Sequence, residues 1–202
     1  SFNLVKSNVY SYIEFNKRKI HLSICNYFTS RGFCEVINYS FTNTLVSKIF
    51  LINENIFSFL ELRNPMSKNF NIMRVSLLPG IVLNLLANYS KNYSTGVLKF
   101  FELGKCFFQC NQTGIIFEFN EIVFVFSGKL LSADNRLYED DFFSYQEVKK
   151  EIECFFSFYN LGGFVEFFHS ETKFSAQLFL FKIRLFKKSV GFFGILSNKI
   201  MN

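Results

Sequence analysis

The residue types that most often hold metals or act as nucleophiles are few in this chain and lie apart from one another. Cys106 and Cys110 have the spacing C-x-x-x-C, but a zinc site needs further ligands, and neither histidine, His21 or His169, is near them in the sequence. Three adjacent acidic residues at positions 139–141 are typical of a solvated loop, because like charges favour contact with water. These groups predict no metal site.

The sequence also offers no nucleophile set and no phosphate-binding loop. With only two histidines, neither of them at a strand-to-helix turn, no Ser–His–Asp or Cys–His arrangement can be assembled. The patterns G-x-G-x-x-G and G-x-x-x-x-G-K-[ST] are both absent, so the glycine-rich turns that hold nucleotide phosphates are missing. Direct chemistry by this chain is therefore not indicated by its motifs.

Length and composition predict one folded domain over residues 1–202. Half of the residues are hydrophobic and 19% are charged, which favours a packed core over disorder. The 31 phenylalanines and the absence of tryptophan are typical of AT-rich codons, and we interpret the phenylalanines as core filling. Five cysteines without paired spacing predict no disulfide framework and a reducing, cytoplasmic location. No apolar run is long enough to predict a transmembrane helix, so no membrane partner is expected.

The net charge of +6 is compatible with an RNA partner, with an acidic protein partner, or with the same codon bias. The lysines and arginines are scattered, with short clusters at positions 17–19 and 187–188. Charge alone therefore leaves these three interpretations open.

The periodicity of apolar residues predicts helices and strands in turn. Helices are expected over residues 17–30 with Gly32 as the stop, over a short segment capped by Asn43, over residues 77–93 with Pro79 in the first turn, and from a Ser144–Glu147 capping box to Gly162. Strands are expected over residues 35–42, 57–62, 97–103, 121–127, 164–169, 177–185 and 190–196, the last two joined as a hairpin through residues 186–189. Hairpin-linked strands with separate helices between them predict the α+β class, with an antiparallel sheet flanked by helices.

Two of these elements carry apolar faces that a neighbouring surface could cover. The first helix places Ile20, Ile24 and Phe28 on one side, following the helical repeat. The first strand places Ile37 and Tyr39 on one side by alternation, with Asn38 on the other. From the pattern alone, the helix could equally serve as an ordinary core helix.

Several segments occur in a characteristic order along nearly the whole chain. They are residues 31–41 (RGFCEVINYSF), 64–65 (NP), 73–80 (MRVSLLPG), 101–104 (FELG), 141–143 (DFF) and 190–196 (VGFFGIL). Together they resemble the synthetase-like core module of the bacterial phenylalanyl-tRNA synthetase β subunit. The resemblance implies the class II aminoacyl-tRNA synthetase fold, an antiparallel sheet with flanking helices, which agrees with the class predicted from periodicity.

The resemblance also implies which residues meet a partner. In this family the first class II motif builds subunit interfaces, and the first helix and first strand of this chain resemble that motif. On this basis Ile20, Ile24, Phe28, Ile37 and Tyr39 are expected to contact the α subunit.

A second implication concerns ATP. Catalytic class II chains place an arginine two residues before a glutamate in the second motif, where the guanidinium pairs with the α-phosphate. The strand over residues 97–103 resembles that motif but has Phe100 in the arginine's position before Glu102, and the third motif has no counterpart before Asn202. We therefore expect this chain to bind no cofactor, and ATP and magnesium to bind at the α subunit. Arg74 and Glu102 are then expected to form an internal charged pair.

The interpretation that follows is a structural one. The chain resembles a catalytically degenerate core module that ends before the third motif, in an assembly of two α and two β subunits that charges tRNA with phenylalanine. Its contribution would be to position the catalytic α subunit and the tRNA. Two alternatives are a generic basic RNA-binding α+β domain, suggested by charge and aromatic content, and a stand-alone class II adenylating enzyme, against which Phe100 counts.

Overall fold

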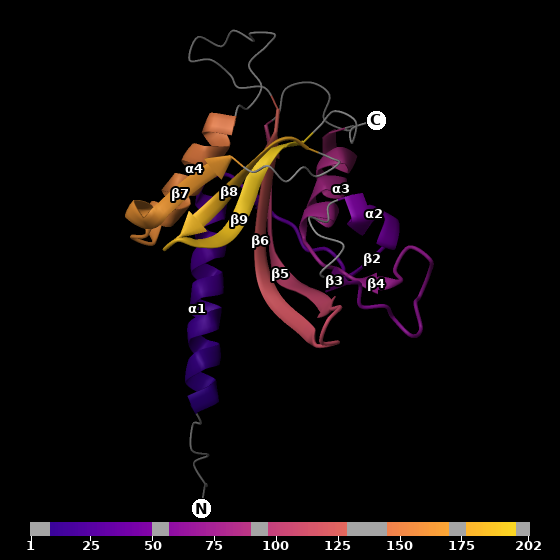
Figure 1. Cartoon of the computed structure of the whole chain (residues 1–202). Helices are drawn as coiled ribbons and strands as arrows, with labels where there is room; N and C mark the ends of the chain where they lie inside the picture. The colour runs from indigo at the N-terminus through magenta and orange to yellow at the C-terminus, as the bar shows by residue number, and fades with distance from the viewer. Residues whose placement is uncertain (1–8, 50–56, 90–96, 129–144, 170–176, 197–202) are drawn as a thin grey trace, which may run out of the picture.

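The computed structural model describes residues 9–49, 57–89, 97–128, 145–169 and 177–196 (Figure 1). In chain order the elements are α1 (Val9–Ser30), β1 (Cys34–Glu35), β2 (Phe41–Thr42), α2 (Thr44–Ile49), β3 (Phe57–Ser58), β4 (Ile72–Met73), α3 (Leu78–Tyr89), β5 (Leu98–Cys110), β6 (Ile116–Ser127), α4 (Tyr145–Phe158), the short 3-10 helix η1 (Gly162–Phe164), β7 (Val165–His169), β8 (Gln177–Leu185) and β9 (Lys188–Leu196). The mixture of helices and largely antiparallel strands confirms the predicted α+β class.

The long antiparallel hairpin of β5 and β6 is the centre of the fold. Its register runs from Leu98 opposite Ser127 to Gln109 opposite Ile116. The turn between the strands contains Gly114 at φ +68°, a conformation that glycine adopts without a steric penalty. Figure 1 shows α2 and α3 on one side of this hairpin, and α1, α4 and the β7–β9 sheet on the other.

The sheet arrangement differs from the prediction in two respects. β1 pairs with β5 in the parallel direction, with Cys34 opposite Phe100, whereas an antiparallel sheet was expected. The strands also divide into a four-stranded sheet of β1, β3, β5 and β6, a β2–β4 pair, and a three-stranded antiparallel sheet of β7, β8 and β9.

The strand predicted over residues 35–42 is interrupted. Only Cys34–Glu35 and Phe41–Thr42 are paired, and the segment between them leaves the ladder. Asn38, which alternation placed on the solvent side, instead lies against β5, while Ile37 is 88% exposed. The buried carboxylate of Glu102 on β5 needs hydrogen-bond donors, and Asn38 supplies them. The free energy of these hydrogen bonds outweighs that of burying Ile37, so Asn38 and not Ile37 faces β5.

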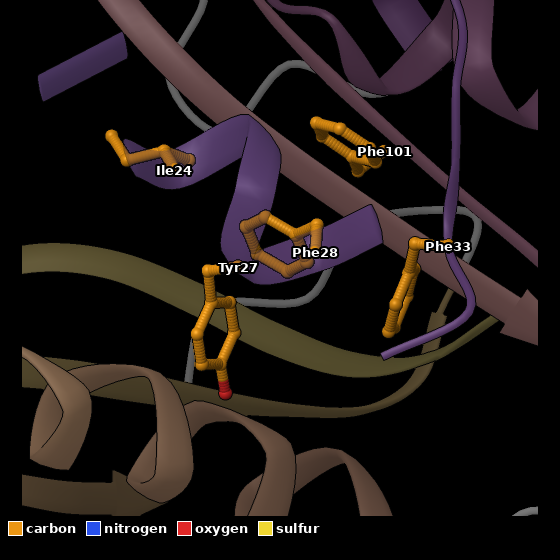
Figure 2. Packing of buried hydrophobic residues seen from close by; sticks show 5 residues of the cluster. All are labelled: Ile24, Tyr27, Phe28, Phe33 and Phe101. Carbon is orange, nitrogen blue, oxygen red and sulfur yellow. The ribbon is translucent and has the colours of Figure 1, made fainter. Parts of the chain in front are cut away.

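The two faces of β5 pack against different helices. Alternation along the strand sends Phe100 toward Ile81, Val82 and Leu85 of α3, and sends Phe101 toward α1. Figure 2 shows the α1 side, where Phe101 lies beside aromatic residues of that helix and of the loop after it. The hairpin is therefore the shared wall of two apolar clusters.

The end of α1 is fixed by a glycine and a ring contact. Gly32 has φ +80°, and the backbone N–H of Phe33 donates to the carbonyl of Phe28 at 3.0 Å, closing the last helical turn. The rings of Phe28 and Phe33 meet edge to face at 5.3 Å. The geometry at Gly32 confirms the predicted end of the helix. The chain then enters β1 at Cys34.

A polar contact joins α1 to α4. Arg31 forms an ion pair with Glu151 of α4 through both its Nε and Nη2 atoms, and the Nη2 to Oε2 distance is 2.8 Å. The hydroxyl of Tyr27 donates to the same carboxylate at 3.3 Å. Burial and the nearby Glu151 charge raise the pKa of Tyr27, which keeps this donor protonated.

The remaining local predictions can be compared one by one. Asn43 caps α2 through its Oδ1 atom, which accepts from the N–H of Leu45 at 2.7 Å. Pro79 lies in the first turn of α3, as expected, and the β8–β9 hairpin is confirmed. The capping residue Ser144 lies outside the described residues. No helix in the described part of the chain is long and apolar enough to span a bilayer.

The ring cluster around Phe28 predicts a large stability effect. Phe28 is fully buried and stacks on Phe101 at 5.0 Å and on Phe155 at 5.5 Å. Phe28→Ala should lower the free energy of unfolding by about 3–5 kcal/mol, because it leaves a cavity where three elements meet. Urea denaturation measures the loss. The matched control is Ile20→Ala on the exposed part of α1, which should change stability by about 0.5 kcal/mol or less; equal losses would contradict the assigned core.

Candidate functional site: a buried charge cluster at the start of α3

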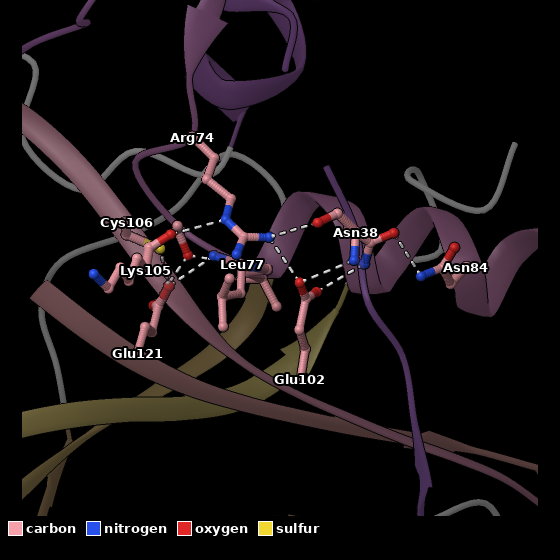
Figure 3. Close-up of polar contacts among 10 residues, drawn as sticks. Asn38, Arg74, Leu77, Asn84, Glu102, Lys105, Cys106 and Glu121 are labelled. Carbon is pink, nitrogen blue, oxygen red and sulfur yellow. Dashed lines mark hydrogen bonds and ion pairs between the residues drawn. The ribbon is translucent and has the colours of Figure 1, made fainter. Parts of the chain in front are cut away.

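Arg74 follows β4 and extends its side chain across the face of β5 that α3 covers (Figure 3). Its Nη1 atom donates to Oε1 of Glu102 at 2.7 Å and to the carbonyl of Asn38 at 3.3 Å, and its Nε atom donates to the carbonyl of Lys105 at 2.9 Å. The side chains of Arg74 and Glu102 are only 9% and 2% exposed. The two residues expected to pair therefore form a buried ion pair with additional hydrogen bonds.

The other donors to Glu102 come from Asn38. The backbone N–H of Asn38 donates to Oε1 at 3.2 Å, and its Nδ2 atom donates to Oε2 at 2.7 Å. The Oδ1 atom of Asn38 accepts in turn from Nδ2 of Asn84 on α3 at 2.9 Å. A buried ion pair is tolerated only when such additional bonds satisfy it, and this set links β5, the segment after β1, and α3.

Gly104 provides the space that Arg74 occupies. A Cβ atom at position 104 would lie 2.2 Å from Nη2 of Arg74, far inside contact distance. Gly80 on α3 is similarly placed, because a Cβ there would lie 3.1 Å from the side chain of Asn38. Close contacts with side chains of the same cluster therefore account for the absence of a side chain at both positions.

A second buried carboxylate, Glu121 of β6, binds the start of α3. Its Oε2 atom accepts from the backbone N–H of Leu77 at 2.7 Å, and its Oε1 atom accepts from the hydroxyl of Ser76 at 3.1 Å. A negative group at this end of a helix satisfies free N–H donors and complements the helix dipole. Glu121 thus anchors α3 to the hairpin.

The protonation states of Glu121 and Cys106 are set mainly by burial. Burial raises the pKa of the Glu121 carboxyl, and hydrogen bonds from Leu77, Cys106 and Ser76 partly oppose that rise. The Cys106 thiol donates to Oε2 of Glu121 at 3.2 Å, and burial followed by the Glu121 charge raises its pKa. Cys106 is therefore a protonated structural thiol and not a nucleophile.

The run from Met73 to Gly80 is accounted for by these contacts. Arg74 neutralises Glu102, Ser76 and Leu77 bind Glu121, and Pro79 begins α3. The guanidinium of Arg74 is bonded to protein groups on both Nε and Nη1. The cluster is thus a clamp that holds α3 on the hairpin.

The rest of this face of the hairpin carries no cation. Strand alternation and the register place thirteen described residues on it, and none is lysine or arginine: Leu98, Phe100, Glu102, Gly104, Cys106, Phe108 and Cys110 of β5, and Phe117, Phe119, Glu121, Val123, Val125 and Ser127 of β6. A triphosphate needs cationic or N–H donors, which this surface does not offer.

A pocket of about 380 Å³ lies next to the clamp, between α2, the start of α3 and the segment after β1. The polar side chains in its wall include Asn38, Arg74 and Asn84, which already bind one another or Glu102. Of the other polar side chains in the wall, Asn43 binds Leu45 and Asn69, and Ser76 binds Glu121. Most of the polar groups in this wall are therefore bonded within the chain.

The five residues expected at the α-subunit interface fall into two groups. Ile24 and Phe28 are buried in the α1 cluster, so they are not available to a partner. Ile20 is 57% exposed on α1, and Ile37 and Tyr39 are 88% and 76% exposed beside the pocket. The part of the predicted apolar face from Ile24 to Phe28 therefore packs in the core of this chain, whereas Ile20 on the same face stays exposed.

The structure also brings together residues that the sequence patterns did not assign to this site. Asn38, Asn84, Gly104, Cys106 and Glu121 all belong to the clamp, although they come from four separate segments of the chain. A charged residue at an alternating position inside an apolar strand, as at Glu121, is the signal that indicates such buried polar contacts. Within the described residues no group of three or more histidine, cysteine, aspartate or glutamate side chains could hold a metal ion, and positions 139–141 lie outside them.

Removing the cation of the clamp should destabilise the folded chain. Arg74→Met should lower the free energy of unfolding by about 3–5 kcal/mol, because Glu102 stays buried without its counter-charge. Adding Glu102→Gln should recover part of the loss, since glutamine removes the charge and still accepts from Asn38. Urea denaturation of both variants, with Arg18→Met on exposed α1 as the control, measures the effect. A loss at Arg74 no greater than at Arg18 would contradict the clamp.

The raised pKa of Glu121 predicts a pH dependence. Its contribution to stability is complete below the unfolded-state pKa of about 4.3 and falls as the pH rises through the folded-state pKa. Glutamine does not titrate, so the stability of the wild type minus that of Glu121→Gln should fall as the pH rises above about 4. Urea denaturation across this range measures the difference. A difference that stays constant or rises with pH would show that burial does not determine the direction of the pKa shift of Glu121.

The sequence of this chain is similar to the sequences of known proteins. The family model described as "Phenylalanyl tRNA synthetase beta chain CLM domain" matches residues 5–202. The phenylalanine–tRNA ligase β subunit of Francisella tularensis is 34% identical over 126 residues, which are 61% of this chain and 14% of that protein. That of Fusobacterium nucleatum is 29% identical over 138 residues, 67% of this chain and 15% of that protein.

The chain thus spans about a seventh of the length of these relatives. Among solved structures, that of Desulfitobacterium hafniense PylSc, a pyrrolysyl tRNA synthetase, matches with a TM-score of 0.55 and 13% identity, over 85% of this chain and 55% of that one. This likeness shows a shared fold. The family match over nearly all residues shows that the chain belongs to the phenylalanyl-tRNA synthetase β chain CLM domain family.

Proposed function

We propose that this chain is the core module of a phenylalanine–tRNA ligase β subunit and supports a catalytic α subunit without carrying the active site. Residues 1–202 would act as one module with the class II synthetase fold, in which the sheet around β5 and β6 corresponds to the catalytic sheet. ATP, magnesium and phenylalanine would bind at the α subunit, and the assembly would contain two α and two β subunits in the cytoplasm. Its contribution to the charging of tRNA is positional.

The observation that carries this proposal is the filling of the α3 side of the hairpin. Phe100, at the position where a catalytic chain would have arginine, is 9% exposed and packs on Ile81 and Leu85 of α3. Arg74, whose side chain lies across that face, is held by Glu102. The occupied space, and the lack of other cations among the described residues of this face, argue against adenylation by this chain and hence against a stand-alone adenylating enzyme.

A partner surface is supported by the shape of α1. Figure 1 shows this helix extending well beyond the hairpin at its N-terminal end. Every side chain from Lys17 to Leu22 is exposed, including the apolar Ile20 and Leu22 at 57% and 52%. A free helical segment of this length is marginally stable in water, so packing against another subunit would stabilise it. We assign this part of α1, together with Ile37 and Tyr39, to the α-subunit contact.

Activity and assembly measurements test the proposal together. ATP–pyrophosphate exchange with phenylalanine should be absent for this chain alone and present when the matching α subunit is added, and the two should co-purify. Exchange by this chain alone would overturn the structural role, and failure to co-purify would overturn the partner.

A pair of variants then tests the surface. Ile20→Glu with Leu22→Glu should reduce co-purification at least about tenfold, because charged groups would be buried at the contact. The control Met66→Glu changes a residue that is 90% exposed in the segment between β3 and β4, and it should have no effect. Equal retention of both variants would place the α subunit elsewhere.

A further inference from the structure

Within the described residues, one side of the β7–β9 sheet packs on α4 and the other side carries exposed aromatic rings. α4 packs on the side that carries Ile183 and Phe193. Because side chains alternate along each strand, the residues next to these in the chain point away from α4. We call this side the outer face. Alternation places Phe168, Lys182, Arg184 and Phe192 on it, and we include Phe164 and Phe186, which are hydrogen-bonded to each other at the ends of β7 and β8.

Cations and rings alternate across this outer face. Phe168, Lys182 and Phe192 lie opposite one another on the three strands. The guanidinium carbon of Arg184 lies 4.3 Å from the ring centroid of Phe168, and Nζ of Lys182 lies 5.9 Å from that of Phe192. Each cation therefore lies over an aromatic ring, and both Lys182 and Arg184 are half-buried.

A second pair of rings extends the outer face toward the β8–β9 turn. The N–H of Phe186 donates to the carbonyl of Phe164 at 3.3 Å, and their ring centroids are 4.6 Å apart. These two rings are 52% and 56% exposed, and those of Phe168 and Phe192 are 40% and 38% exposed. The expectation that the phenylalanines fill the core is therefore wrong for these four.

The charge of the outer face is mainly positive. No ion pair joins Lys182 or Arg184 to a carboxylate among the described residues. Lys187 adds an exposed cation in the adjoining turn, and Glu166, opposite Arg184, is the acidic residue of this side. A cationic surface with exposed rings is complementary to a polyanion that carries flat aromatic groups.

We propose that the outer face binds an RNA segment whose bases are unstacked. The rings of Phe164, Phe168, Phe186 and Phe192 would stack on bases, and Arg184 and Lys182 would contact phosphates. An acidic protein segment would use the cations but not the ring faces, which is why RNA is the better match. The inference deepens the proposed function, on which it rests for the presence of RNA in the assembly.

Fluorescence anisotropy with this chain and a labelled oligouridine of about 12 nucleotides tests the proposal. Lys182→Gln with Arg184→Gln should weaken binding at least about tenfold and reduce the slope of log Kd against log salt by about 1.4. Phe168→Leu with Phe192→Leu should weaken binding about fivefold or more at an unchanged slope, because leucine keeps the apolar volume and loses the stacking surface.

The matched control is Lys17→Gln with Arg18→Gln on α1, which removes the same charge from another surface and should leave affinity unchanged. Equal weakening by this control would show diffuse charge attraction and overturn the assignment, as would leucine variants that bind like the wild type. A polyglutamate peptide that binds as tightly as the oligouridine would identify an acidic protein partner instead. Both outer-face variants should still co-purify with the α subunit, so loss of RNA binding alone leaves the proposed function standing.

Discussion

The buried ion pair between Arg74 and Glu102 is the constraint on which most of the surrounding structure depends. Two charges removed from water require further hydrogen bonds, and the neighbouring backbone and side chains are arranged to supply them. The absence of a side chain at Gly104 and the departure of Asn38 from its strand both follow from that requirement. α3 is then fixed in place, since Asn84 completes the same network.

The same hairpin separates two kinds of packing. On the α1 side, stacked aromatic rings dominate, and shape complementarity among Phe28, Phe101 and Phe155 sets the geometry. On the α3 side, apolar residues of the hairpin pack under α3. Next to them, Glu102 and Glu121 form hydrogen bonds to Arg74 and Leu77. A surface organised in this way stabilises a helix that lies over it, and leaves little room for a substrate between them.

The sequence predicted elements well wherever local signals decide them. The glycine stop at Gly32, the Asn43 cap, Pro79 in the first turn and the β8–β9 hairpin all depend on neighbours a few residues apart. The parallel pairing of β1 and the inward turn of Asn38 could not be predicted in this way, because both depend on contacts with β5, which lies far along the chain. Likewise, apolar periodicity identified the face of α1 that carries Phe28 but not which molecule covers it.

The parallel pairing of β1 with β5 has a consequence for synthesis on the ribosome. The β5–β6 hairpin joins neighbouring segments and can close early, whereas β1 and the rings of α1 must wait for partners that are translated much later. Phe28 can meet Phe33 soon after α1 is made, but its stacking partners Phe101 and Phe155 emerge much later. The order of translation thus leaves this helix open to chaperones for longer than any other described helix of the molecule.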